Sequence, residues 1–279
     1  MIKVSDYMTP IVAIASPQDT LAAIRNIMLR RRVGRVPVVD GSRLVGIVSR
    51  TDLALALRPN GPAWRRRPLE YTSVWEIMSK PVITISVNES ISKAAETMLN
   101  SGVTGLPVLD DDKIVGMITT SDLTRCLKEH GDPSKKVKEH MCVEVAVAKP
   151  LHPISRVIKI LVKSPSHRVI VVDAEGRPIG IVTPTDLAFV RVSAGSSKSK
   201  VVYDSEAPKR SRKIEFLGLT YAKDVMRRPI HFISEEASVV DAASLMSSAK
   251  IGGLPVLDKK KNLSGLFSKI EVLRLVKDL

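Results

Sequence analysis

The sequence predicts an α/β (α+β) fold built from four copies of a small βαββα unit. Four short apolar strands each end in an aspartate, and each aspartate is followed six or seven residues later by a glycine, two apolar residues and a serine or threonine. An apolar residue of a helical pattern also precedes every one of these aspartates by twelve residues. The four aspartates are Asp40, Asp110, Asp173 and Asp258. A spacing that recurs in every copy indicates an internal repeat.

Within the first copy, the elements follow the order strand, helix, strand, strand, helix. Residues 12–14 are β-like, and residues 16–20 form a helix start with an early proline. Leu21, Ile24 and Met28 then share one helical face. Two strands meet at a short turn over residues 40–43, and a second helix opens at residues 50–53.

A unit of about 55 residues buries too little surface to be stable alone, so we expect the units to pair. The boundaries that we predict for units 1 to 4 are residues 1–58, 74–130, 137–192 and 220–279. The linkers, residues 59–73 and 193–219, are basic and poor in apolar residues, which is typical of flexible loops.

Composition restricts the class of protein. The chain has 279 residues, of which 44% are hydrophobic, and a net charge of +14, which favours anionic partners. Two cysteines exclude a disulfide scaffold, no apolar run reaches the ~18 residues of a membrane span, and the first residues do not resemble a secretory signal. These features predict a cytoplasmic protein. The single glutamine and five asparagines suggest a thermophile.

The repeat resembles the cystathionine-β-synthase (CBS) domain family. The resemblance rests on Met-Thr-Pro at residues 8–10, on the Pro-Val strands, and on the pattern from Gly46 to Asp52, which is Gly, two apolar residues, Ser/Thr, two residues and Asp. It implies that units associate as two tandem pairs in a flat disc. It also implies that AMP, ADP, ATP or S-adenosylmethionine binds in clefts between paired units. Four units in one chain resemble the γ subunit of AMP-activated protein kinase.

The pattern from glycine to aspartate, called the carboxylate motif below, has a chemical rationale of its own. A carboxylate on the first helical turn can accept both hydrogen bonds of a ribose diol, and nearby hydroxyls can donate to phosphate. The ribose candidates are Asp52, Asp122 and Asp186. The hydroxyl candidates are Ser49, Thr51, Thr119, Ser121, Thr183 and Thr185. An aspartate three residues after Ser or Thr also suits simple helix capping, and that alternative stays open.

Unit 4 departs from the pattern, because Glu271 replaces the aspartate and Ile270 replaces the second hydroxyl. We therefore expect its site to be empty or structural. The phosphate candidates are strand-borne cations in the odd units, where the even units have Gly105 and Gly253 instead. They are Arg35, Arg168 and the adjacent His167, with Lys80 as a substitute in unit 2.

Three functions remain open at this point: a sensor of adenosine-containing ligands, a nucleic-acid-binding regulator that uses the basic linkers, and a scaffold with empty clefts. The sequence lacks the phosphate-loop, zinc-protease and nucleophile-elbow patterns, so we expect neither catalysis nor a catalytic cofactor. We expect no metal site. The regulated protein is unknown, and a homodimer is one arrangement left open.

Overall fold

The computed structural model describes residues 2–10, 13–56, 69–184, 186 and 221–279. Unit 1 contains α1 (Val4–Tyr7), β1 (Thr9–Pro10), α2 (Leu21–Arg31), β2 (Arg35–Asp40), β3 (Arg43–Ser49) and α3 (Arg50–Ala56). The first linker contains η2 (Leu69–Tyr71). Unit 2 contains η3 (Val74–Glu76), β4 (Ile85–Ser86), α4 (Ile91–Ser101), β5 (Gly105–Asp110), β6 (Lys113–Thr119) and α5 (Thr120–His130). The predicted α/β class is confirmed.

The second half of the chain repeats this order. Unit 3 contains α6 (Val137–His140), β7 (Val147–Ala148), α7 (Ile154–Lys163), β8 (Val169–Val172) and β9 (Pro178–Val182). Unit 4 contains α9 (Ala222–Val225), β10 (Ile233–Ser234), α10 (Val239–Ser248), β11 (Gly253–Leu257), β12 (Leu263–Ser268) and α11 (Lys269–Lys277). The predicted linker 193–219 lies outside the described residues, as do residues 59–68 of the first linker.

Local sequence explains the elements of unit 1. The side chain of Thr20 caps α2 by accepting a hydrogen bond from the Ala23 backbone N–H at 3.2 Å, and the predicted apolar face of α2 is buried. The predicted turn joins β2 and β3, with Asp40 opposite Arg43. Val12, at the start of the predicted first strand, lies outside the described residues, and Ala15 forms a parallel bridge to Val38 instead.

In units 2 to 4 the short first strand runs parallel to the second, and the second runs antiparallel to the third. The segment that opens each unit, however, docks on the neighbouring unit. Strand β1 pairs antiparallel with β6, and isolated bridges join Ser79 to Ile47, Cys142 to Leu266, and Arg227 to Ile181. Unit 1 therefore exchanges its opening segment with unit 2, and unit 3 exchanges with unit 4.

A methionine of every exchanged segment lies against a glycine of the partner unit. In unit 3, a Cβ added to Gly180 would lie 2.8 Å from the Cγ of Met226, which is too close for a normal contact. Three equivalent contacts join Met78 to Gly46, Met8 to Gly116, and Met141 to Gly265. The glycine of each carboxylate motif is therefore the seat of a partner's methionine, and this packing fixes the two units against each other.

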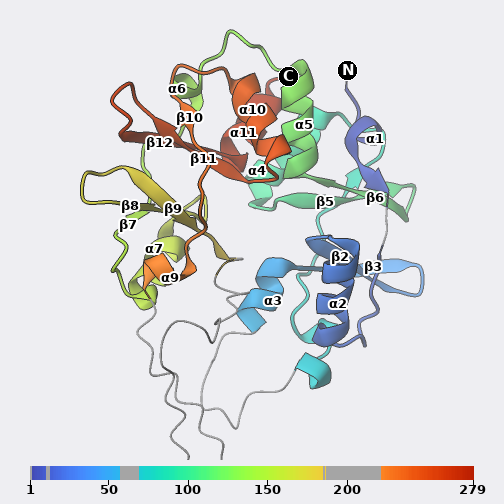
Figure 1. The fold of residues 1–279 in the computed structure, drawn as a ribbon. Coiled ribbons are helices and arrows are strands. Elements are labelled where there is room, and N and C mark those ends of the chain that lie inside the picture. Colours follow the sequence, from blue (N-terminus) through green and yellow to red (C-terminus); the bar gives the residue numbers. More distant parts are fainter. Residues whose placement is uncertain (1, 11–12, 57–68, 185, 187–220) are drawn as a thin grey trace, which may run out of the picture.

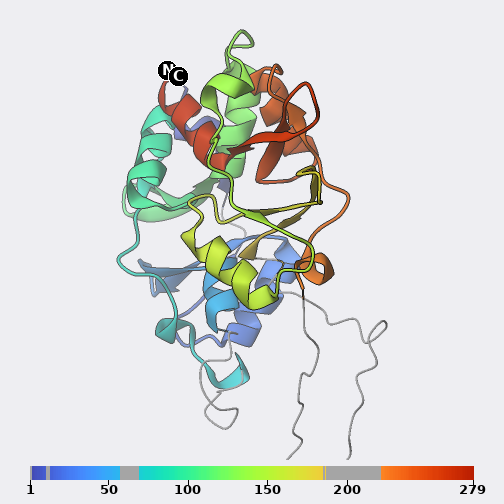
Figure 2. The ribbon, with the colours of Figure 1, turned by 90° about the vertical axis from the view of Figure 1, so that its left-hand side faces the viewer.

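The four units surround a common centre (Figure 1). Units 2 and 4 share one hydrophobic core, in which α5 packs against α10, and α11 packs against both α4 and α5. Units 1 and 3 each have a smaller core, which the exchanged segments of unit 2 (Val74, Met78) and unit 4 (Ala222, Val225, Met226) complete. Seen from the side of units 3 and 4, unit 4 lies above unit 3 (Figure 2).

The methionine seat predicts a specific loss of stability. We expect Gly180→Ala to lower the free energy of unfolding by about 1–3 kcal/mol, because the new methyl group overlaps Met226 in a packed site. Thermal and urea unfolding measure the change. The double variant Gly180→Ala/Met226→Ala should lose less stability than the sum of the losses in the two single variants, because the shortened side chain leaves room for the new methyl group.

Gly34→Ala is the matched control for this prediction, because a Cβ there has no neighbour closer than 3.9 Å. An equal loss of stability in the control and in Gly180→Ala would contradict the seat.

Candidate functional site

The carboxylate of each complete motif caps its own helix. Oδ2 of Asp52 accepts hydrogen bonds from the backbone N–H and the hydroxyl of Ser49, both at 2.7 Å. Asp122 makes the same two bonds to Thr119, at 2.8 and 2.7 Å, and Asp186 makes them to Thr183, at 2.9 and 2.6 Å. The capping alternative is therefore realised in every copy, and it engages one oxygen of each carboxylate.

The second oxygen of each aspartate has a different environment. Oδ1 of Asp122 lies 3.8 Å from a guanidinium nitrogen of Arg125, on the same helix. Oδ1 of Asp186 forms a short ion pair with Nε of Arg227, which comes from the exchanged segment of unit 4. Among the described residues, no cation lies at ion-pair distance from Asp52. The three motifs thus share one geometry but differ in how far the second oxygen is already occupied.

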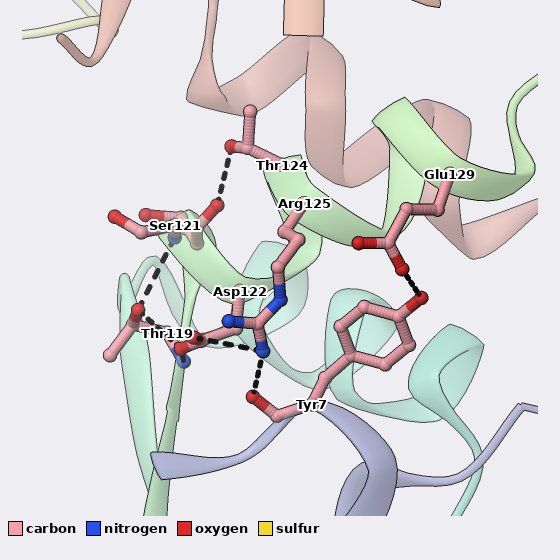
Figure 3. A network of polar contacts seen from close by, with 8 residues as sticks. Tyr7, Thr119, Ser121, Asp122, Thr124, Arg125 and Glu129 are labelled. Carbon is pink, nitrogen blue, oxygen red and sulfur yellow. Dashed lines mark hydrogen bonds and ion pairs between the residues drawn. The ribbon is translucent and has the colours of Figure 1, made fainter. Parts of the chain in front are cut away.

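Arg125 also contacts the exchanged segment of unit 1. Its guanidinium donates a 2.8 Å hydrogen bond to the carbonyl of Tyr7, while the Tyr7 hydroxyl donates to Glu129 (Figure 3). Burial and the Glu129 hydrogen bond raise the pKa of the Tyr7 hydroxyl. Tyr7 therefore connects the carboxylate of unit 2 to the segment that unit 1 contributes.

In unit 4 the replacement residue Glu271 is also a cap. It accepts hydrogen bonds from the backbone N–H and hydroxyl of Ser268, at 2.8 and 2.7 Å. Its side chain is 3% exposed. Glu271 therefore caps its helix in the same way as the three aspartates cap theirs.

The arginines of the odd units reach into the even units. Arg35 begins β2, opposite Ser49, and its guanidinium donates to the Thr104 hydroxyl of unit 2. A Cβ at Gly105 would lie 3.2 Å from Nε of Arg35, and a Cβ at Gly253 would lie 3.2 Å from Nε of Arg168. Sequence reasoning interpreted Gly105 and Gly253 as positions where a cation is missing. In the structure, the lack of a side chain at these glycines leaves space for the arginine of the partner unit.

Burial lowers the pKa of both arginine side chains. It lowers the pKa of Arg168 to about 10, although Glu271 opposes the shift, and it also lowers the pKa of Arg35. Arg168 donates a 2.7 Å hydrogen bond to the carbonyl of Ser166. Neither arginine forms an ion pair with a described carboxylate, so each carries a poorly compensated charge.

Lys269 is a functional candidate that sequence reasoning missed. It is the first residue of α11, and its ammonium donates a 3.0 Å hydrogen bond to the hydroxyl of Ser121 in unit 2. Burial and the nearby charges of Arg168 and Arg35 together lower its pKa to about 8, while Asp122 opposes the shift. The signal in the sequence was a lysine directly after Ser268. It stands in the unit 4 motif, which sequence reasoning had set aside as a ligand site because Glu271 replaces the aspartate.

We call Arg35, Arg168 and Lys269 the cationic cluster. Its members come from units 1, 3 and 4, and unit 2 adds Ser121. In the described part of the chain, no acidic side chain forms an ion pair with any of the three. Two helices, α5 and α11, also begin beside the cluster, and a helix N-terminus favours negative charge. This arrangement suits an anion.

The remaining candidates are not gathered at the cluster. The His167 side chain is exposed on left-handed backbone (φ 48°) and makes no polar contact with a described residue. The Lys80 ammonium lies 3.6 Å from the centroid of the Trp75 ring. Thr51 is exposed, and Thr185 lies outside the described residues.

The described residues contain no group of three or more His, Cys, Asp or Glu side chains that could hold a metal ion. Cys126 is fully buried, and burial raises the pKa of its thiol to about 11, which favours the neutral form at ordinary pH. In the same parts of the chain, no helix has the length and apolar character that crossing a membrane requires.

The comparison with protein families now defines the class. The CBS domain model matches residues 4–59, 74–129, 137–193 and 222–278. The chain belongs to the CBS domain family, as the resemblance predicted. Each match contains one methionine seat and one carboxylate motif or its unit 4 variant.

Known relatives extend over most of the chain. The uncharacterized protein MJ1225 of Methanocaldococcus jannaschii is 27% identical over 270 residues, which cover 92% of each protein. Its crystal structure, described as that of a candidate archaeal homologue of g-AMPK, superposes with a TM-score of 0.78 at 23% identity, covering 98% of this chain and 99% of that chain. The crystal structure of an uncharacterized conserved protein from Pyrococcus horikoshii superposes with a TM-score of 0.68 at 22% identity, covering 99% of this chain and 100% of that chain. These structures support the four-unit fold.

Relatives named as enzymes match a smaller part. Inosine-5'-monophosphate dehydrogenase of M. jannaschii is 35% identical over 126 residues, which are 45% of this chain and 25% of the enzyme.

The position of Lys269 predicts a pH-dependent stability. Lys269→Met should raise the free energy of unfolding at pH 7, because it removes a partly buried ammonium that two cations repel. Above the folded pKa of about 8 the wild type loses this proton, while the unfolded chain keeps it up to about 10.5. Since the unfolded state then binds more protons, the wild type gains stability relative to the variant, by at most about 1.4 kcal/mol per pH unit.

Urea unfolding between about pH 7 and pH 10 measures this difference, with the exposed Lys113→Met as the control. A difference between wild type and Lys269→Met that does not change with pH would contradict the assignment.

Proposed function

We propose that this chain is a regulatory sensor of adenosine nucleotides, AMP, ADP or ATP, which bind between paired CBS units. The observation that carries the proposal is the cationic cluster, in which three partly buried cations from three units lack an acidic partner among the described residues. Like charges brought together in a poorly solvated place destabilise the protein unless an anion joins them. A phosphate group has the charge and the acceptor atoms to do so.

The carboxylate motifs supply the second half of the site. Each motif aspartate uses one oxygen for its helix, and the other oxygen is the group that a ribose diol would contact. The proposed ribose ligands are Asp52, Asp122 and Asp186. Thr51, Ser121 and the cationic cluster would hold phosphate, because the hydroxyls of Ser49, Thr119 and Thr183 already donate to the aspartates. His167 and Lys80 remain candidates that would have to turn toward a bound ligand.

The charge of the cluster selects among adenosine-containing ligands. S-adenosylmethionine carries a sulfonium and an ammonium group against one carboxylate, so its net charge is positive. Three unpaired cations would repel such a ligand, whereas they attract the phosphate of a nucleotide. The structure thus favours nucleotides over S-adenosylmethionine.

Regulation follows from the origin of the cluster residues. Arg35, Arg168 and Lys269 stand on separate units, and Ser121 stands on the fourth. A ligand that bridges them would bind one arrangement of the units more tightly than others and would shift the population toward it. The output would be a changed surface for a regulated protein, without catalysis by this chain.

The first test separates phosphate recognition from ribose recognition. We expect nucleotide-stripped wild type to bind AMP at least about tenfold more tightly than adenosine, since a hydrogen bond to a charged group contributes about 1.5–3 kcal/mol. Arg168→Ala should reduce this preference. Isothermal titration calorimetry with AMP, ADP, ATP, adenosine and S-adenosylmethionine measures the affinities.

Arg177→Ala is the control for Arg168→Ala, because Arg177 pairs with Asp173 and Glu175 at an exposed turn. Equal binding of AMP and adenosine by wild type, or a full preference in Arg168→Ala, would refute phosphate recognition here.

The second test concerns the ribose. Asp52→Asn should weaken the binding of AMP and the binding of adenosine by the same factor, about tenfold or more, because it removes a charged acceptor that both ligands would use. The amide oxygen can still cap α3, so the fold should be kept. Loss of AMP binding with unchanged adenosine binding would argue against a ribose contact at this residue.

A further inference from the structure

Arg227 occupies a position at which the other three units carry a small uncharged residue. Its backbone N–H donates a 2.9 Å hydrogen bond to the carbonyl of Ile181, five residues before Asp186. The same register places Thr9 opposite Met117, Ser79 opposite Ile47, and Cys142 opposite Leu266, each five residues before its motif carboxylate. The side chain at this position therefore stands beside the carboxylate motif of the partner unit. Only the motif of unit 3 has a cation there, which is Arg227 of unit 4.

The arginine completes the coordination of Asp186. One carboxylate oxygen is held by Thr183, and the other forms the ion pair with Nε of Arg227. The Asp186 side chain is 7% exposed, whereas that of Arg227 is 58% exposed. The carboxylate is thus fixed and enclosed, while its counter-ion is largely in solvent and can leave without breaking up a packed core.

We propose that Arg227 is a counter-ion gate on the Asp186 site. It occupies the oxygen that a ribose diol would use, so an adenosine ligand must displace it. The inference rests on the proposed function, and it makes the Asp186 site weaker than the otherwise similar Asp52 site.

In the part of the chain that the structure describes, two further arginines lie near a motif carboxylate, and neither serves as such a gate. Arg274 lies 3.7 Å from Glu271, which replaces the ribose aspartate in unit 4. Arg125 lies 3.8 Å from Asp122, beyond hydrogen-bond distance, and its guanidinium is held by the carbonyl of Tyr7. Arg227 is held by a direct contact to the carboxylate itself, and the structure gives its guanidinium no second partner among the described residues. Among the described residues, only the unit 3 contact would compete directly with a ribose.

Arg227→Ser, which reproduces the residue of unit 2 at this position, tests the gate. We expect it to tighten the Asp186-dependent binding of adenosine and of AMP by about fivefold to tenfold, because no half-exposed ion pair has to break before binding. Calorimetry with both ligands on the nucleotide-stripped chain measures the change. The gain should vanish in Arg227→Ser/Asp186→Asn.

The reciprocal variant Ser79→Arg installs the same cation beside Asp52, where it should weaken binding by a similar factor, as its unit 3 counterpart does. It also protects the test if Arg227→Ser fails to fold. Unchanged or weaker adenosine binding in a folded Arg227→Ser, or unchanged binding in Ser79→Arg, overturns the gate. If wild type binds AMP while these changes fail, only the gate is refuted. If no variant binds any adenosine ligand, the proposed function is refuted as well.

Discussion

The seating of a methionine on a partner's glycine is the constraint on which the rest of the structure depends. A strand residue without a side chain leaves room for the methionine, and the bridge beside it fixes the register of the exchanged segment. Once the register is fixed, the position after the methionine stands next to the carboxylate motif. The start of the partner's hairpin then also lies within reach of an arginine. Packing therefore decides which polar groups meet.

The cationic cluster shows how this packing is used. Arg35 and Arg168 reach across each pair because Gly105 and Gly253 leave space for them. Two arginines at equivalent positions of paired units would meet, so the alternation of arginine and glycine has a steric reason. Confining like charges lowers the stability of the protein. An anion that relieved this repulsion would stabilise the folded state, and this gain would add to its binding affinity.

Sequence reasoning identified the repeat, the helices and hairpins, and the capped carboxylates, since these depend on local patterns and on spacing within one unit. It did not identify Lys269, because that residue acts across units and stands in a motif with a replaced aspartate. It also interpreted Gly105 as an absent cation, although the glycine admits Arg35. The same limit applies to Arg227, whose partner Asp186 is 41 residues away. Contacts between units follow from the exchange of segments, which no single unit's pattern contains.

Four copies of one unit need not make four equal sites. Asp52 has no cation at ion-pair distance among the described residues, Asp122 shares Arg125 with Tyr7, and Asp186 is paired with Arg227. Glu271 is enclosed as a helix cap. The backbone geometry of the motif is common to all, so the differences come from single side chains supplied by the neighbourhood. A repeat that keeps its fold while varying these neighbours can respond to one ligand over a wider range of concentration than identical sites would, because each site then fills at its own affinity.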